Sequence, residues 1–246
     1  MRQNSIIAAF LFSSLLVSCK LKTAENDAYP NNPNICNEKG EPKDSLTFYF
    51  PSLLKVSGQE TKTEIDTFLL QYYSRYLLAF KEPVLCNFYM GHDTYRFLWL
   101  RSFNRPVVIS IHKEGDEVWL TTKELDRQLR YLDGIVFGPP DGDAAAALQR
   151  RDSMIKRNSQ ANIIMNQTYL LSSAEWEKFE DLLRECSFWT MNPVDTGVLG
   201  FDGAEWIIEG HLQDKYRFID RWSPDGSFSE CGKYLIRLSG LKEEIY

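Results

Sequence analysis

The chain has 246 residues, and its 34 acidic and 28 basic side chains give a formal net charge of −6. This acidic balance argues against a general nucleic-acid binder, because such binding depends mainly on cations that neutralise phosphates. It also disfavours electrostatic adhesion to an anionic membrane, while an aromatic content of 13 % supplies ample material for a hydrophobic core.

The N-terminus is laid out like an export signal. Arg2 precedes an apolar stretch, residues 6–17, that is too short to span a bilayer but has the length of a signal-peptide core. The stretch ends in Leu16-Val17-Ser18-Cys19, which resembles the lipobox of bacterial lipoproteins. The resemblance implies that residues 1–18 are a signal peptide and that Cys19 becomes an acylated first residue, with palmitate-like chains. A simple secretory peptide with an incidental cysteine is the alternative.

The stretch after the signal is polar. Residues 19–45 contain three prolines and several asparagines but little apolar material, so they are predicted to be a lipidated N-terminus followed by a flexible tether. Residues 46–246 are then long enough for one domain.

The first half of that domain combines a helix with adjacent strands. Thr61 and Glu64 form a capping-box pattern, and apolar residues recur at helical spacing, which predicts a helix over 64–80. Three strand candidates follow at 94–102, 105–112 and 117–122, and the short links between them favour a meander.

Residues 133–160 are predicted to be a loop insertion. The stretch opens with Gly and Pro, and it holds the one basic cluster of the domain. That cluster fits either a docking patch for an acidic partner or lipid headgroups, or a solvated loop. Its members are Arg150, Arg151, Lys156 and Arg157.

The second half repeats the mixture. A strand at 161–171 precedes a helix at 173–186 with a capping box of Ser172 and Glu175. Residues 201–226 alternate with a period of two and predict a hairpin. A third capping box, Ser227 and Glu230, predicts a last helix that stops at Gly240. The order of elements predicts an α+β fold, a mainly antiparallel sheet made of a meander plus a C-terminal hairpin, with three or more helices largely on one face.

The hairpin also carries a resemblance. Its DGxxW, EG, Tyr and RWSP elements resemble a motif set of an uncharacterised bacterial family, and the resemblance covers roughly residues 94–241. It implies no activity. The motif residues are Asp202, Gly203, Glu205, Trp206, Glu209, Gly210, Tyr216 and the run Asp220-Arg221-Trp222-Ser223-Pro224.

The hairpin supplies the candidate site residues. Glu209, His211 and Arg221 could together perform general acid–base work on an anionic substrate, or they could form a structural ion pair beside an exposed histidine. Trp206 and Trp222, with Asp220, could bind a sugar or peptide, or the rings could belong to the core. The sequence shows no metal-ligand spacing and no nucleotide-binding or cofactor motif, so no cofactor is expected.

Four cysteines follow Cys19. Export would permit disulfides, and four cysteines allow three pairings, which the sequence leaves open. Two of them lie on apolar helical stripes and equally fit buried free thiols. The four are Cys36, Cys86, Cys186 and Cys231.

Together these patterns predict a lipoprotein anchored to a bacterial cell membrane or outer membrane and facing the periplasm or exterior. Its domain would be a non-catalytic binding or interaction module. The alternatives are a cell-envelope hydrolase using Glu209, His211 and Arg221, and a toxin-binding immunity-type protein.

Overall fold

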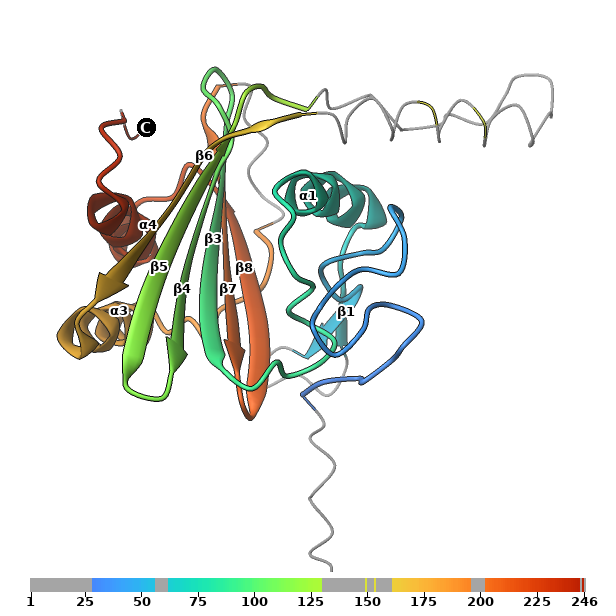
Figure 1. Ribbon diagram of the computed structural model, residues 1–246, viewed down its shortest axis with the longest axis horizontal. Helices are drawn as coiled ribbons and strands as arrows, with labels where there is room; N and C mark the ends of the chain where they lie inside the picture. The colour runs from blue at the N-terminus through green and yellow to red at the C-terminus, as the bar shows by residue number, and fades with distance from the viewer. Residues whose placement is uncertain are drawn as a thin grey trace, which may run out of the picture.

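A six-stranded antiparallel sheet forms the centre of the protein, as shown by a computed structural model that describes residues 28–55, 62–129, 149, 153, 161–195, 202–243 and 245 (Figure 1). The strand order is β6-β5-β4-β3-β7-β8, and every neighbouring pair is antiparallel. The strands are β3 (Asp93–Arg101), β4 (Val107–Glu114), β5 (Glu117–Leu125), β6 (Ile163–Leu171), β7 (Ala204–Leu212) and β8 (Lys215–Trp222).

The predicted α+β fold is confirmed, and its two halves meet at β3. The meander β3-β4-β5 continues into β6, and the hairpin β7–β8 joins it by pairing β7 with the free edge of β3. Arg96 of β3 lies opposite Glu209 of β7 in this pairing. The most central strand therefore depends on a contact between distant parts of the chain.

Helices cover both faces of the sheet (Figure 1). The helices α3 (Ser173–Glu185) and α4 (Gly226–Ser239) lie on one face, which we call the α3/α4 face. The helix α1 (Thr67–Ala79), the small hairpin β1 (Leu53–Lys55) and β2 (Lys62–Glu64), and the chain from residue 28 onward lie on the other, the α1 face. Of the three helices whose bounds the structure describes, two thus share one face.

Aromatic side chains form the core on the α3/α4 face of the sheet. Trp206 packs against Phe97 and Trp99, with ring centroids 5.2 and 6.0 Å apart. A side chain at Gly232 of α4 would collide with the Trp206 ring, so the glycine lets the helix approach the sheet. Cys186 and Cys231 are both free and buried in this layer, with their sulfur atoms 3.7 Å apart.

The observed helix caps agree with only one of the three predicted capping boxes. The capping box of Ser172 and Glu175 is confirmed, and Gly240 ends α4 in the left-handed conformation at φ 71°. The other two boxes are wrong. Asp66, rather than Thr61, caps α1 by accepting a bond from the Phe68 amide, and α4 follows Asp225 with no side-chain cap. The start of a helix therefore depends on the path of the chain that enters it as well as on the local sequence pattern.

The predicted tether needs a larger correction. Within the range 19–45, residues from 28 onward pack on the sheet and belong to the domain. Tyr29 is 4 % exposed and donates its hydroxyl to the Leu212 carbonyl, at 2.7 Å, while Cys36 is 1 % exposed. Asparagine side chains make the turns of this segment, which we call the N-terminal segment (residues 28–50).

Several predictions lie outside the described residues. The signal peptide, Cys19 and most of the 133–160 insertion with its basic cluster are among them. Within the described ranges, no helix combines the length and apolar character that a bilayer crossing requires.

Candidate functional site

The predicted catalytic residues do not converge. Glu209 and His211 point to the α1 face, whereas Arg221 lies opposite Trp206 on the α3/α4 face. The Arg221 guanidinium donates to the carbonyls of Asn192, Pro193 and Asp220. The expectation that the three side chains meet at one end of the hairpin is therefore wrong, because adjacent residues of a strand face opposite ways.

Glu209 belongs to a buried ionic cluster that runs across the α1 face. Its carboxylate binds Arg96 at 2.5 and 2.6 Å and accepts a bond from the Tyr216 hydroxyl at 2.8 Å. Arg96 also lies 3.6 Å from Glu82, which in turn pairs with Lys123 at 2.7 Å. Burial raises the pKa of Glu209, and the Arg96 guanidinium opposes that rise. We call these five residues the ionic cluster.

His211 is a structural residue rather than an exposed one. It is fully buried, its Nδ1 lies 2.7 Å from the Leu85 carbonyl, and its Nε2 accepts a bond from the Met90 amide. Burial lowers its pKa to about 4, so the ring is neutral at neutral pH. Both nitrogens are committed to the backbone, and the ring stacks on Tyr89 at 5.2 Å. His211 therefore holds a loop in place.

The residues predicted for ligand binding are also separated. Trp206 is 1 % exposed in the core of the α3/α4 face, while Asp220 and Trp222 belong to the α1 face. The core alternative therefore holds for Trp206. Asp220 accepts a bond from the Tyr73 hydroxyl at 2.7 Å and is 4 % exposed.

The pair of carboxyl groups formed by Glu205 and Asp220 was not predicted from the sequence. Burial, followed by the neighbouring Asp220 charge, raises the pKa of Glu205 to about 10, and burial raises that of Asp220 as well. The pair therefore carries a proton at neutral pH. The signal was present in the hairpin pattern, since Glu205 and Asp220 share its α1 face, but their burial by α1 could not be read from it.

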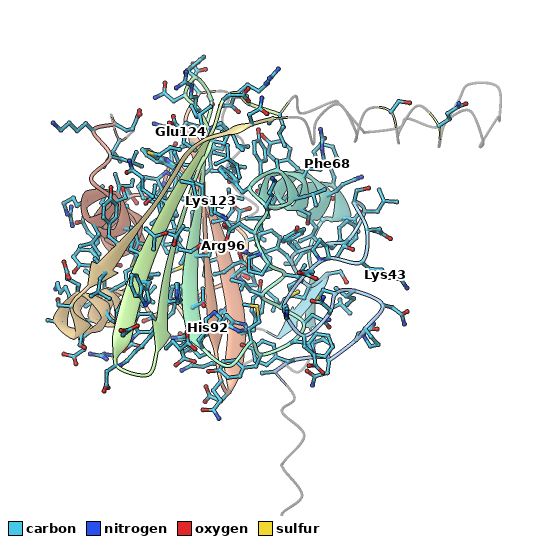
Figure 2. The ribbon with its side chains drawn as sticks, viewed as in Figure 1. Lys43, Phe68, His92, Arg96, Lys123 and Glu124 are labelled. Carbon is cyan, nitrogen blue, oxygen red and sulfur yellow. The ribbon has the colours of Figure 1, made fainter. Side chains whose placement is uncertain are left out.

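A polar cavity of about 180 Å³ opens beside the ionic cluster. Lys123 and Glu82 line it together with His92 and His112, whose ring centroids are 5.4 Å apart. Figure 2 shows His92, Arg96 and Lys123 following one another along the sheet. Burial and the neighbouring His92 lower the pKa of His112. Among the residues that the structure describes, no three side chains form a group suited to a metal ion.

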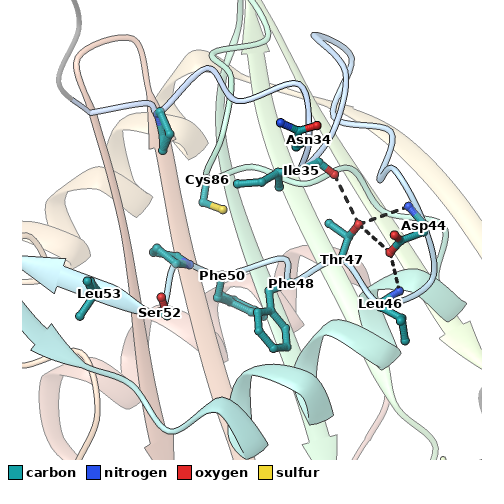
Figure 3. A pocket seen from close by; sticks show the side chains of 12 residues that line it. Asn34, Ile35, Asp44, Leu46, Thr47, Phe48, Phe50, Ser52, Leu53 and Cys86 are labelled. Carbon is teal, nitrogen blue, oxygen red and sulfur yellow. Dashed lines mark hydrogen bonds between the residues drawn. The ribbon is translucent and has the colours of Figure 1, made fainter. Parts of the chain in front are cut away.

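The N-terminal segment builds a second cavity on the same face, which we call the N-terminal pocket. Asn87, which is fully buried, clamps this segment: its side chain donates to the Asn32 carbonyl at 2.8 Å and accepts from the Asn32 amide at 3.0 Å. Asp44 caps the next turn by accepting a bond from the Leu46 amide at 2.8 Å (Figure 3). Phe50 anchors the far end, with its ring 5.0 Å from Phe218 of the sheet.

The N-terminal pocket has a volume of about 460 Å³ and is mainly apolar. Its rim carries exposed hydrophobic side chains, Leu46 at 40 %, Phe48 at 37 % and Leu53 at 49 %. The lining residues are Pro30, Asn34, Ile35, Asp44, Leu46, Thr47, Phe48, Phe50, Pro51, Ser52, Leu53 and Cys86.

Several polar groups of the N-terminal pocket are committed to other contacts. Burial raises the pKa of the Cys86 thiol, so this thiol is protonated at neutral pH. Among the polar side chains of the lining, Thr47 and Asp44 are bonded to each other and to the segment's backbone, and Asn34 accepts a bond from Lys43. A third cavity of about 540 Å³, between Lys39 and Pro83, is also mainly apolar, although Lys39, Glu41 and Lys81 are among its lining residues.

No protein-family model, no curated protein and no solved structure matches the chain. The resemblance of the hairpin to an uncharacterised bacterial family therefore stays a prediction.

Proposed function

We propose that the protein is a lipoprotein of the bacterial cell envelope, anchored through Cys19 to the cell membrane or outer membrane, whose domain binds an apolar group in the N-terminal pocket. One observation carries the binding role: a pocket of about 460 Å³ rimmed by exposed Leu46, Phe48 and Leu53. Ligand sites are typically mainly apolar cavities of roughly 300–1,000 Å³ with a few placed polar groups.

The position of the pocket fits the anchor. Pro30 lines the pocket, and Cys19 and Ala28 lie nine positions apart, a separation that can span at most about 30 Å. A lipidated Cys19 would hold the pocket within that reach of the bilayer surface. The ligand class that fits both facts is a hydrocarbon group, such as an acyl chain or a cluster of apolar side chains.

The two alternative functions have less structural support. A hydrolase built on Glu209, His211 and Arg221 needs the three around one cavity, but Arg221 lies on the opposite face, and none of the three lines the polar cavity, the N-terminal pocket or the third cavity. A toxin-binding immunity-type role stays a prediction.

The binding role is tested by photo-crosslinking in the native membrane. Benzoylphenylalanine replaces Phe48 in one variant and Phe103, which is 73 % exposed and outside the pocket, in the control. We expect an adduct from position 48, with a mass that identifies the hydrocarbon-bearing molecule, and none from position 103. Equal labelling at both positions, or none at 48, would overturn the proposed pocket.

The anchor is tested separately. Metabolic labelling with an alkyne fatty acid should mark the wild type, and Cys19→Ala should abolish the label and release the domain from the membrane fraction. An unlabelled wild-type chain with an intact Met1 would overturn the lipoprotein assignment.

A further inference from the structure

The outer edge of β6 is unusual for the edge of a sheet. Within the described ranges β6 ends the sheet, and its outer edge has no strand beside it. The strand is nine residues long, and the run from Ile163 to Leu171 contains no charged residue and no proline. A register shift at Ile164 interrupts its pairing with β5 near its start, and the pairing is regular from Met165 to Leu171. Edge strands of monomeric proteins are usually short, charged, bent or covered, because an open edge pairs readily with other chains.

The opposite edge of the same sheet is protected in the usual ways. Strand β8 carries Lys215, Arg217 and Arg221, and its Asp220 amide bonds to the Pro193 carbonyl at 2.7 Å. Val194 forms a bridge beside it. Among the residues that the structure describes, one edge of the sheet is therefore blocked and the other has no neighbour.

Large apolar side chains are exposed along β6. Leu170 is 61 % exposed, Ile164 48 % and Tyr169 43 %. Tyr169 lies opposite Leu120, a member of the α3/α4 core. Leu170 lies opposite Trp119, and both of these side chains point to the α1 face. A strand added at this edge would cover apolar surface on both faces of the sheet.

From these features we infer that β6 pairs with β6 of a second copy of this chain, antiparallel and centred on Gln167. The sequence of β6 is self-complementary about that residue. Asn166 would lie opposite Thr168 and Met165 opposite Tyr169, while Ile164, at the register shift, would lie near Leu170. From Met165 to Tyr169, polar residues meet polar residues and apolar residues meet apolar ones.

The neighbouring registers lack this match. In this dimer the helices of both copies lie on the same side of the joined sheet, so two residues that oppose each other must point to the same face. The residue on which the pairing is centred can therefore change only by whole residues, for example from Gln167 to Asn166 or Thr168. Centring on Asn166 sets Met165 against Gln167, and centring on Thr168 sets Asn166 against Leu170. Of these three registers, only the one centred on Gln167 sets polar residues against polar ones and apolar residues against apolar ones.

The resulting dimer is closed by a two-fold axis, as most soluble homo-oligomers are. The two six-stranded sheets join into one, with α3 and α4 of both copies on the same side. The contact uses no residue of the N-terminal pocket, so the inference stands independently of the proposed binding role.

The oligomeric state of the full-length protein in detergent tests this inference. Sedimentation should show a dimer for the wild type, and Gln167→Lys should weaken it roughly tenfold or more, because the two like charges would lie directly opposite each other. Thr190→Lys adds the same charge at an exposed site away from β6 and should leave the dimer intact. A monomeric wild type, or an unaltered dimer in Gln167→Lys, would overturn the inference.

Crosslinking in membranes tests the register. Gln167→Cys places two thiols across the axis, and a short bis-maleimide should join them into a covalent dimer. Thr190→Cys and the wild type, whose Cys36, Cys86, Cys186 and Cys231 are buried, serve as controls. Loss of the crosslink, or its transfer to a different protein, would show that a second copy does not occupy the edge.

Discussion

The two faces of the sheet are built on different principles. The α3/α4 face is closed by aromatic packing around Trp206 and Trp99, with α4 held close through Gly232. The α1 face carries the ionic cluster, the carboxyl pair of half-buried Glu205 and buried Asp220, and the cavities of about 180, 460 and 540 Å³.

The difference indicates a division of labour. Apolar packing stabilises a fold without cavities, whereas buried charges are costly to desolvate and stabilise only when they are fully paired. Buried charged side chains also occur on the α3/α4 face, where Arg101 lies over the Trp99 ring, but the ionic cluster lies on the α1 face beside the cavities. Under the proposed function, the α1 face would supply the binding site and the α3/α4 face its support.

The strongest test of this comparison is to break the ionic cluster. Arg96→Met leaves the Glu209 carboxylate buried and without its partner, so the free energy of unfolding should fall by about 3–5 kcal/mol in urea titrations. The double variant Arg96→Met with Glu209→Leu should recover much of the loss. A small effect of Arg96→Met would mean that solvent reaches the cluster.

The matching test on the α3/α4 face is Gly232→Ala. The added methyl group would collide with the Trp206 ring, so we expect a loss of about 1–3 kcal/mol despite the better helix propensity of alanine. Thermal unfolding measures it. Adding Trp206→Phe should make room and reduce the penalty of the alanine. Stabilisation by Gly232→Ala alone would contradict the close approach of α4.

The pH dependence of stability should also separate the two faces. The folded-state pKa of Glu205, about 10, is above its usual value of 4.5, so its contribution to stability is complete below pH 4.5 and is lost as pH rises towards 10. Glu205→Gln, which cannot ionise, should flatten the fall in unfolding free energy across that range. An unchanged pH profile would mean that Glu205 is ionised in the folded protein.

The smallest effect is expected at the rim of the N-terminal pocket. Phe48→Ala removes a partly exposed ring, so the free energy of unfolding should change by about 0.5 kcal/mol or less. The same variant should weaken capture of the hydrocarbon ligand. A large loss of stability would instead make Phe48 part of the core and would blur the distinction between the faces.

The sequence predicts what depends on local periodicity. The stripe beginning at Trp176 and the capping box of Ser172 place α3 correctly, and the period of two in the hairpin assigns Glu209 and Trp206 to opposite faces. It could not predict the ionic cluster, because Arg96 and Glu209 are 113 residues apart and meet only through strand order.

The N-terminal segment shows a second limit. Its asparagines and prolines have the composition of a linker, yet Asn87 and the turns that precede Gly40 hold it against the sheet. Composition cannot separate asparagines that are solvated from those that bond to the backbone of another segment. The N-terminal pocket, which this segment builds, was therefore absent from the prediction.

The central place of β3 has a consequence for how the molecule reaches its native state. One edge of β3 pairs with β4 nearby, but the other waits for β7, more than 100 residues later in the chain. Pairings across such separations are slow to form, because a long loop must close first. If the chain is exported as proposed, the edge of β3 would be exposed while the C-terminal part is still being translocated, and chaperone contacts should concentrate on that strand.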